Sequence, residues 1–437
     1  LDKRLDGGTT PTDYNKTSGS AYQAPRFDYT KDGDKKGLLI EEARTNSLTQ
    51  AINLSGYTSS QTLWVTNSTV SPTGARDADR LYEDSSANVY HKMNYTASTN
   101  ANTLSFYAKK GAVRDWVYTH LYSGSAEVEY AFFNLSTGQV GTTSGLGGYG
   151  MEDVGNGWYR CWVYRSTAGY SNARIGLAEA DNDFKHDGDT SAYVSLWGLQ
   201  EEIGGSSPTS LIPTYGSTAT RSADVVNVTG TNFSRFFKDT EGTIVVDVQI
   251  PKGWKDTNYN RFYSFNDGNY TNRILSWLNV SAGQEPRGQI VAGGSDQGSI
   301  IAKNIKINTG EIARLGQSYK VNSHYVTLDG STGTEDTTVT LPTGIDTLNI
   351  GSGFNGVSPI GGWIRRLRYF NKKKSDTQVQ KLTDTSFLLD KYKGAKAAHS
   401  LRSLRDGRDN SPVTRIRREY DSYEADYTAN QVANGDL

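Results

Sequence analysis

The stretch WVYTHLY, residues 116–122, alternates between two kinds of side chain along its whole length. Its even positions are aromatic residues and one histidine: Trp116, Tyr118, His120 and Tyr122. Its odd positions are aliphatic or small: Val117, Thr119 and Leu121. Successive side chains of an extended chain point to opposite faces, so this period of two predicts a β-strand with two different faces.

The same period of two recurs in two long regions of the chain, and it decides the fold class. The first region holds LSFYAKK (104–110), VEYAFFN (128–134), WYRCWVYR (158–165) and YVSLWGLQEE (193–202). The second holds TIVVDVQI (243–250), RFYSFND (261–267), NRILSWLNV (272–280), HYVTLDG (324–330) and GWIRRLRYF (362–370). Because turn-forming residues separate the runs, the spacing predicts an all-β protein with two antiparallel β-sandwich (jelly-roll) domains in tandem.

One segment departs from this pattern. KSDTQVQKLT, residues 374–383, places Val379 and Leu382 on one face of a helix and Ser375 at the position of an N-cap. The single cysteine, Cys161, rules out an internal disulfide framework and a cysteine-based zinc site. We expect Cys161 to be a buried small hydrophobe rather than a reactive thiol.

The composition excludes several classes of protein. The 437 residues are 35% hydrophobic, and no window approaches the ~20 apolar residues of a membrane span, so we expect no membrane insertion. The 46 Lys and Arg residues nearly balance the 47 Asp and Glu residues, giving a net charge of −1. Such a balance argues against a nucleic-acid-binding protein, which normally carries excess basic charge.

The pattern divides the chain into four regions. We expect an extended N-terminal arm over 1–52, a first sandwich over 53–228, a second over 229–385 and a C-terminal segment over 386–437. The Pro/Ser/Thr-rich stretch at 204–221 is expected to join the two sandwiches.

The C-terminal segment is divided by charge. Residues 391–418 carry a balance of +7, and residues 419–437 a balance of −5. Mutual pairing of the two halves and contact with nucleic acid are both open interpretations, the first being the usual fate of charge runs. Pairing within or between copies, and so a homo-oligomer, would use these side chains: Arg415, Arg417, Arg418, Asp421, Glu424 and Asp426.

Two stretches are candidate ligand sites. The aromatic face of 116–122, formed by Trp116, Tyr118, His120 and Tyr122, could stack sugar rings or could pack against protein. We expect the Val117, Thr119 and Leu121 face to be the more buried one, since aliphatic side chains pack most easily between sheets.

The second candidate site is the loop DNDFKHDGD, residues 181–189. Its four carboxylates, Asp181, Asp183, Asp187 and Asp189, could together bind calcium, which takes oxygen ligands. The loop lacks the spacing of an EF-hand, and turn formation explains Asp and Gly here equally well. Calcium is the one cofactor that the sequence suggests.

Catalytic motifs are missing from the sequence. It contains no G-x-S-x-G, no H-E-x-x-H and no phosphate-binding loop. The adjacent pairs Glu41/Glu42 and Glu201/Glu202 would point to opposite faces of a strand, so neither pair alone forms a glycosidase couple. We therefore expect the protein not to be an enzyme, although distant carboxylates could still converge.

Several phrases together resemble known modules. PRFDY (25–29), GLLIEEARTN (37–46), GNGWYR (155–160) and LWGLQEE…PTSLIPTYGSTATRSADV (196–225) resemble the carbohydrate-binding-module-like jelly roll of tailed-phage virion proteins. LNIGS…IGGWIRRLRYFNKKKSD, at 348–376, is similar to a concanavalin-A/laminin-G-like sandwich, and 397–431 resembles the opening of a further lectin-like module.

This resemblance implies a function and a location. It implies a bacteriophage structural protein, such as a tail fibre or capsid fibre, at the surface of the virion. Its partners would be other virion proteins, further copies of the chain and host-surface carbohydrate. The alternative is a glycan-active hydrolase or lyase, a depolymerase with lectin-like modules.

Overall fold

The structure is a computed structural model that describes residues 25–98, 100–123, 126–166, 170–251, 260–279, 285–301 and 306–384. These residues form 27 β-strands, two short α-helices and two 3-10 turns, which confirms the predicted all-β class. No helix in the described part of the chain has the length and apolar character of a membrane span. The segment predicted to assemble copies, 386–437 with its arginines and acids, lies outside the described residues.

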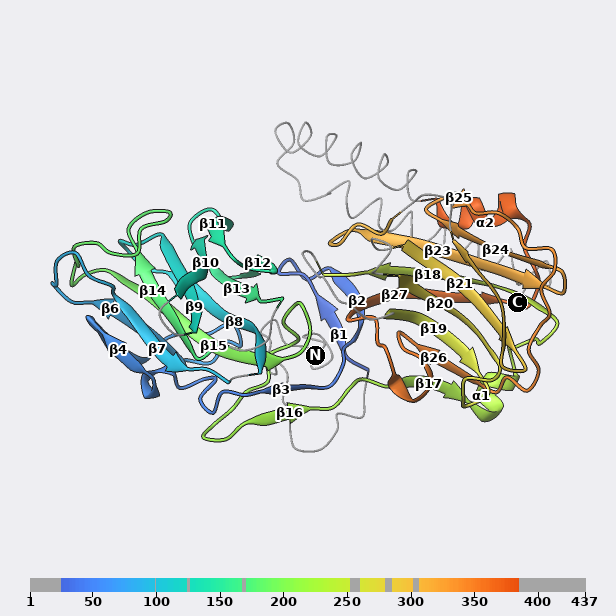
Figure 1. Cartoon of the computed structure of the whole chain (residues 1–437), viewed down its shortest axis with the longest axis horizontal. Helices are drawn as coiled ribbons and strands as arrows, with labels where there is room; N and C mark the ends of the chain where they lie inside the picture. The colour runs from blue at the N-terminus through green and yellow to red at the C-terminus, as the bar shows by residue number, and fades with distance from the viewer. Residues whose placement is uncertain are drawn as a thin grey trace, which may run out of the picture. The chain divides into compact units, whose positions relative to one another are not determined.

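The chain divides into two compact units (Figure 1). Unit 1 ends at Val225 and also takes in Pro359–Trp363, and unit 2 begins at Val226. Each unit is described by itself below, with all its strand pairings antiparallel.

Unit 1 contains two sheets. The six-stranded sheet has the order β11 (Gln139–Ser144), β10 (Ala126–Asn134), β9 (Trp116–Ser123), β14 (Asn172–Ala178), β7 (Lys92–Thr96), β4 (Thr58–Ser60). The eight-stranded sheet runs β12 (Gly148–Gly155), β13 (Trp158–Tyr164), β8 (Ala101–Lys110), β15 (Tyr193–Ile203), β3 (Arg44–Asn46), β16 (Ala219–Arg221), with β6 (Ala78–Glu83) on β15 and β5 (Thr62–Thr69) on β6. A hairpin of β1 (Phe27–Tyr29) and β2 (Lys35–Ile40) and a turn, η1 (Leu54–Gly56), complete the unit.

The main core of unit 1 lies between these two sheets. Leu104 and Phe106 of β8 share one buried cluster with Val117 and Leu121 of β9. The ring of Phe106 meets the ring of Phe133 edge-on at 6.0 Å, so the inner faces of the sheets interdigitate as in a β-sandwich. Cys161 of β13 belongs to the same cluster, as expected, and burial raises the pKa of its thiol well above the usual value.

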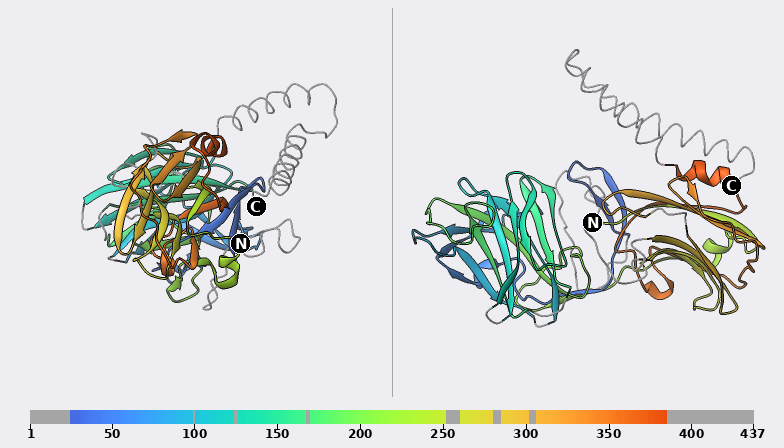
Figure 2. Two further views of the ribbon diagram at one scale, coloured as in Figure 1. Left: turned by 90° about the vertical axis from the view of Figure 1, so that its right-hand side faces the viewer. Right: turned by 45° about the horizontal axis from the view of Figure 1, so that its top comes forward.

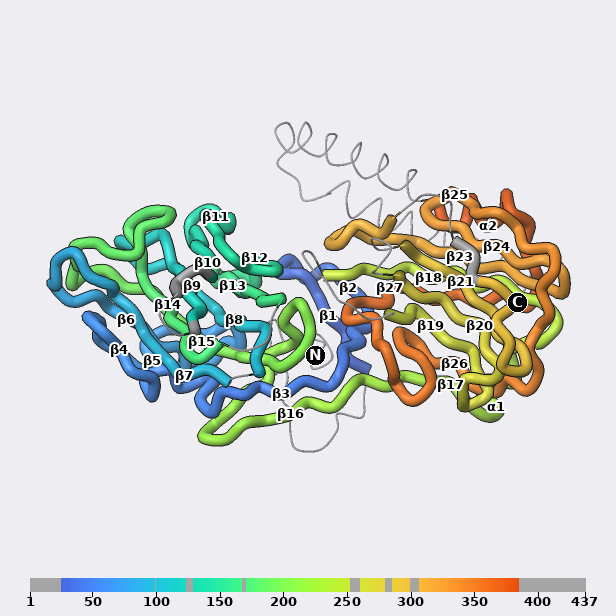
Figure 3. The backbone as a smooth tube through the Cα atoms, in the orientation of Figure 1, coloured from blue at the N-terminus to red at the C-terminus, as the bar shows by residue number. Residues whose placement is uncertain are grey.

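The first strands differ from the extended arm predicted over 1–52. Strand β3 pairs with β16, more than 170 positions along the chain, through Asn46–Ala219 and Arg44–Arg221, and the backbone trace of Figure 3 shows the two side by side. Ile40 is fully buried. The stretch from residue 25 onward is therefore part of the folded unit, because backbone pairing incorporates strands whose side chains are polar.

Unit 2 also has two sheets and two short helices. One sheet includes β27 (Gly362–Phe370), β18 (Glu241–Gln249), β23 (Ile312–Lys320), β24 (Ser323–Leu328) and β25 (Ser331–Thr332). The other has the order β17 (Val226–Thr229), β26 (Thr347–Ile350), β19 (Asn260–Asn266), β20 (Arg273–Asn279), β21 (Glu285–Ala292), β22 (Ser295–Ile301). The remaining elements are α1 (Gly230–Ser234), η2 (Phe354–Gly356) and α2 (Asp376–Thr383).

A series of hydrogen-bonded polar side chains crosses the core of unit 2 between its sheets. The Tyr263 hydroxyl of β19 donates to Oε1 of Gln317 on β23 at 2.5 Å, which turns the Gln317 amide nitrogen toward Nε2 of His324, 2.9 Å away. The ring nitrogen must therefore accept, so His324 is neutral in the fold. Burial lowers the pKa of His324 to about 4 despite the opposing effect of Asp336.

Helix α2, the orange helix in both views of Figure 2, confirms the predicted cap and packs on strand β23. The Gln378 amide donates to Oγ of Ser375 at 3.3 Å, and the Ser375 amide donates to the Gln378 side chain at 2.9 Å, which forms a capping box. Val379 lies over Gly316, where a Cβ would stand 2.4 Å from its Cγ1. Glycine at 316 thus permits the close approach of helix and sheet.

Candidate functional site

The aromatic face of β9 is covered, so the difference in burial that the sequence predicted between the two faces is almost absent. Tyr118 is 0% and His120 2% exposed, whereas Val117, Thr119 and Leu121 are each 0% exposed, so both faces of the strand are buried. The expectation that the aliphatic face would be clearly the more buried one is therefore not met. The aliphatic face does point into the sandwich as predicted, since Val117 and Leu121 lie in the core between the sheets.

A loop between β14 and β15 covers the outer face. Phe184 in this loop lies with its ring centroid 5.0 Å from that of Tyr118 and 5.4 Å from that of His120. It also contacts Tyr130 and Phe132 of β10, at 5.0 and 4.7 Å, so the aromatic side chains form a second small core. Trp116 and Tyr122 are half-buried, so the four residues do not present an open row for a sugar.

The four aspartates of residues 181–189 point to different partners. Asp181 accepts from the amide and hydroxyl of Thr142 at 2.8 and 2.9 Å, and Asp187 accepts from the Asn88 amide at 2.9 Å. Asp189 accepts from the Ser191 amide and hydroxyl. Only the bonds of Asp189, to a residue two positions on, are those of a turn, whereas Asp181 and Asp187 tie the loop to distant segments. Together with Asp183 the carboxylates form no group of three within 4.8 Å in the described part of the chain, and calcium at this loop stays a prediction.

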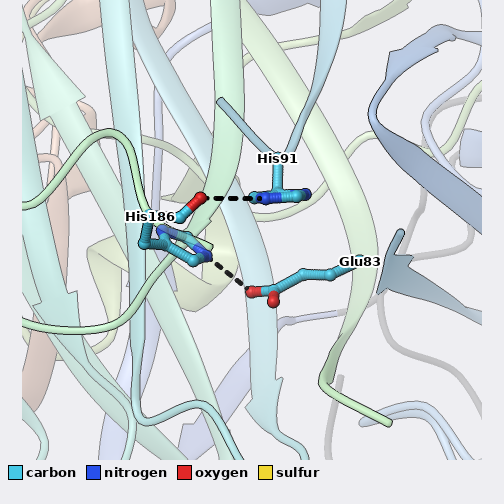
Figure 4. Close-up of side chains that lie close together, drawn as sticks. All are labelled: Glu83, His91 and His186. Atoms are coloured by element: carbon cyan, nitrogen blue, oxygen red, sulfur yellow. Dashed lines mark hydrogen bonds and ion pairs between the residues drawn. The ribbon is translucent and has the colours of Figure 1, made fainter. Parts of the chain in front are cut away.

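A different group of metal-ligating residue types does converge, within the described residues. Glu83 at the end of β6, His91 before β7 and His186 in the loop after β14 place ligand atoms within 4.8 Å of one another, and all three are buried (Figure 4). No sequence pattern predicts this group, because its members come from three separate segments and no spacing motif connects them.

The Glu83 carboxylate is saturated by four donors. Oε1 accepts from Nε of Arg114 and from Nε2 of His186, each at 2.8 Å. Oε2 accepts from Nη2 of Arg114 at 3.0 Å and from the Asp189 amide at 2.9 Å. Burial by itself raises the pKa of Glu83, but the hydrogen bonds from His186 and Arg114 outweigh burial and lower the pKa to about 2.

His91 completes the group without contacting the carboxylate. Its Nδ1 lies 2.8 Å from the carbonyl oxygen of Gln61, and its Nε2 lies 3.3 Å from that of His186. The centroids of the His91 and His186 imidazole rings are 4.8 Å apart. Gly188 adjoins the His91 ring so closely that a Cβ there would lie 2.5 Å from its Cε1.

These contacts fit a structural cluster better than a metal centre. A metal ion would need carboxylate lone pairs that Arg114 and His186 already occupy, and it would lie beside the guanidinium charge. The cluster instead ties the loop that holds His186 to strand β6. Because Phe184 is two residues from His186, the same anchor holds the aromatic cover over Tyr118.

Comparison with known proteins gives weak likenesses. A scan against protein-family models finds no match, and neither does a search of curated proteins. Among solved structures, the chain is similar to the NanB sialidase from Streptococcus pneumoniae, at 15% identity and a TM-score of 0.30, over 36% of this chain and 26% of the sialidase chain. The matched part thus spans about a quarter of that sialidase chain.

Two further similar structures are smaller proteins. Ruminococcus gnavus IT-sialidase CBM40 is matched at 15% identity and a TM-score of 0.29, over 34% of this chain and 84% of that one. Domains LG4-5 of the mouse laminin alpha1 chain are matched at 10% identity and a TM-score of 0.22, over 80% and 93% of the two chains. The β-sandwich architecture of each unit itself follows from the strand pairings described above.

Proposed function

We propose that this chain is a non-enzymatic structural protein of a tailed-phage virion, a fibre or decoration component of tail or capsid that contacts host-surface glycans. The support is the resemblance of its sequence phrases to virion jelly rolls, together with two units that are each built from paired antiparallel sheets. In this role the chain contacts other virion proteins and further copies of itself at the particle surface.

The state of the buried carboxylates supports the non-enzymatic part of the proposal. Glu41 accepts from the amide and the hydroxyl of Ser210, each at 2.8 Å, and from Nη2 of Arg26 at 2.9 Å. Burial opposes ionisation, but Arg221 and Arg26 lower the pKa of Glu41 to about 2. Glu41, like Glu83, is therefore ionised at neutral pH and cannot serve as a general acid.

Within the described residues, Glu201 is one of three carboxyl groups, with Asp79 and Asp329, whose pKa is raised in the fold. Burial raises the pKa of Glu201 above its usual value. The residue is, however, 0% exposed, and its Oε2 accepts from Oγ of Ser47 at 2.5 Å and from the Ser98 amide at 2.9 Å. A polysaccharide could not touch this carboxyl group without opening the sheet, so its raised pKa reflects burial rather than catalysis.

Fractionation of particles tests the virion assignment. Phage particles from a lysate of the source are purified by density gradient, and an antibody against the chain is used for blotting and for gold labelling. We expect the chain to band with intact particles and the gold to decorate their surface. A chain that remains in the soluble fraction, with unlabelled particles, would contradict the proposal.

A further inference from the structure

A half-exposed aromatic ring in unit 2 lies close to two arginines. Tyr270, in the turn between β19 and β20, is 49% exposed, and Phe354 of η2 meets its ring edge-on at 4.5 Å. The guanidinium carbon of Arg273 lies 5.2 Å from the Tyr270 ring centroid, and that of Arg261 lies 5.9 Å from it. Arg273 also donates to the Tyr270 carbonyl oxygen.

Neither guanidinium forms an ion pair with a carboxylate in the described part of the chain. The nearby acids have other partners: Asp267 accepts from the Asn272 side chain at 2.9 Å, and Asp296 accepts from the Gln289 side chain at 2.6 Å. The buried Nε of Arg273 has no hydrogen-bond partner among these residues. Burial, and then the charge of Arg261, lowers the pKa of Arg273, as expected for two cations held together.

The loop after β26 fixes this arrangement. Gly353 lies so close to Arg261 that a Cβ there would stand 2.1 Å from Nη1. The Arg261 amide donates to the Ser358 carbonyl oxygen at 3.0 Å, and Asn355 and Ser358 both adopt the left-handed backbone region, with φ of 54° and 48°. A loop that accepts such strain around a charged side chain holds that side chain in place.

We infer that Tyr270, Arg261 and Arg273 bind a carboxylate-bearing sugar of a glycan, of the uronic- or sialic-acid type. The two guanidinium groups supply the charge-assisted donors that a carboxylate requires, and the open ring supplies a surface for the C–H face of a sugar. This inference rests on the glycan-binding part of the proposed function and specifies its ligand class.

The surrounding charges favour a single carboxylate over a polyanion. Asp267 and Asp296 lie close enough to raise the pKa of Arg273 through their charge. They would repel a run of phosphates, whereas one carboxylate on an otherwise neutral ring needs only the two guanidinium groups. A nucleic-acid backbone is therefore a poor fit to this surface.

Titration calorimetry with matched variants tests the inference. The full chain is titrated with an oligosaccharide that contains glucuronic acid and, in parallel, with the same oligosaccharide after reduction of its carboxylates to alcohols. A sialylated trisaccharide serves as the second acidic probe. We expect the acidic sugars to bind at least about tenfold more tightly than the neutral one, since a charge-assisted bond is lost on reduction.

Arg287 offers a matched control for the two arginines. Its guanidinium carbon also lies near an aromatic ring, 5.5 Å from the Trp277 ring centroid. Unlike the other two arginines, however, Arg287 forms an ion pair with Glu285, with Nη2 and Oε2 2.7 Å apart. We expect Arg261→Gln and Arg273→Gln each to weaken acidic-sugar binding about tenfold or more, and Arg287→Gln to leave it within twofold. Melting curves of all three variants confirm that each remains folded.

Three outcomes would overturn the inference. They are equal binding of acidic and reduced sugars, equal losses for Arg261→Gln and Arg287→Gln in folded protein, and no binding of any probe by the unmodified chain. None of these outcomes bears on whether the chain bands with virions, so failure of this site and failure of the virion assignment are distinguishable.

Discussion

Replacing Glu83 by glutamine tests the interpretation of the buried cluster as a structural anchor. Glu83 has a 0% exposed side chain, and Arg114, its bidentate partner, has an 8% exposed one. Glu83→Gln keeps the size of the side chain, removes its charge and leaves the buried guanidinium without its bidentate carboxylate partner. Breaking a buried ion pair from one side costs about 3–5 kcal/mol, which in a unit of this size lowers the melting temperature by about 6–20 °C.

Differential scanning calorimetry measures this loss, and Glu179→Gln is its control. Glu179 approaches the same guanidinium at 3.6 Å, but its side chain is 60% exposed, so we expect its loss to cost less than about 1 kcal/mol. Because the pKa of Glu83 is depressed to about 2, its stabilisation is complete above pH 4.5 and disappears as the pH falls toward 2. A Glu83→Gln variant no less stable than Glu179→Gln at pH 7 would refute the reasoning.

Three further predictions concern stability and assembly. The folded pKa of His324 is about 4, below its usual 6.5, so the unfolded state binds a proton first as the pH falls. The free energy of unfolding of unit 2 should therefore decrease by about 3 kcal/mol between pH 6.5 and pH 4. Urea unfolding with equal stability at both pH values would contradict this. Gly316→Ala should destabilise unit 2 by about 1–3 kcal/mol through its contact with Val379, whereas Gly56→Ala, with no neighbour nearer than 3.7 Å, should be tolerated; equal melting temperatures would be the negative result. The full chain should sediment as a salt-sensitive oligomer and a chain ending at residue 385 as a monomer, and identical monomeric behaviour of both would argue against assembly through the C-terminal segment.

The strands were largely predictable because alternation is a local property. Strand β9 occupies Trp116–Ser123 where the pattern predicts residues 116–122, and β13 occupies Trp158–Tyr164 within the predicted 158–165. Helix α2 was predictable for the same reason, since Ser375 and Gln378 are three residues apart and complete the cap by themselves.

Burial of the aromatic face was not predictable from the same pattern. Period two shows that a strand has two different faces, but it does not show whether a loop covers the outer one. Phe184, which covers Tyr118 and His120, is far along the chain and follows a run of aspartates that indicates only a turn. The position of that loop depends on the bond between His186 and Glu83, a contact between distant segments.

The paired arginines around Tyr270 were missed for a related reason. Arg261 and Arg273 lie within strands β19 and β20, at positions where alternation reads them as ordinary outward-facing residues. Their significance depends on two features of the fold. The neighbouring acids, Asp267 and Asp296, accept hydrogen bonds from other side chains, and glycine at 353 lets the loop approach Arg261 closely. Two neighbouring arginines that form no ion pair with a described carboxylate are a property of the folded surface, which no linear motif encodes.

The most direct test of a glycan-binding protein without catalytic activity is one incubation followed over time. The purified chain is mixed with an acidic host-surface polysaccharide, and size-exclusion chromatography with light scattering follows the molar mass of the polymer while reducing ends are assayed. We predict that protein elutes with the polymer, that the polymer keeps its molar mass and that no new reducing ends form. A steady fall in polymer mass, with release of reducing ends or unsaturated sugars, would contradict the account and identify the chain as a depolymerase.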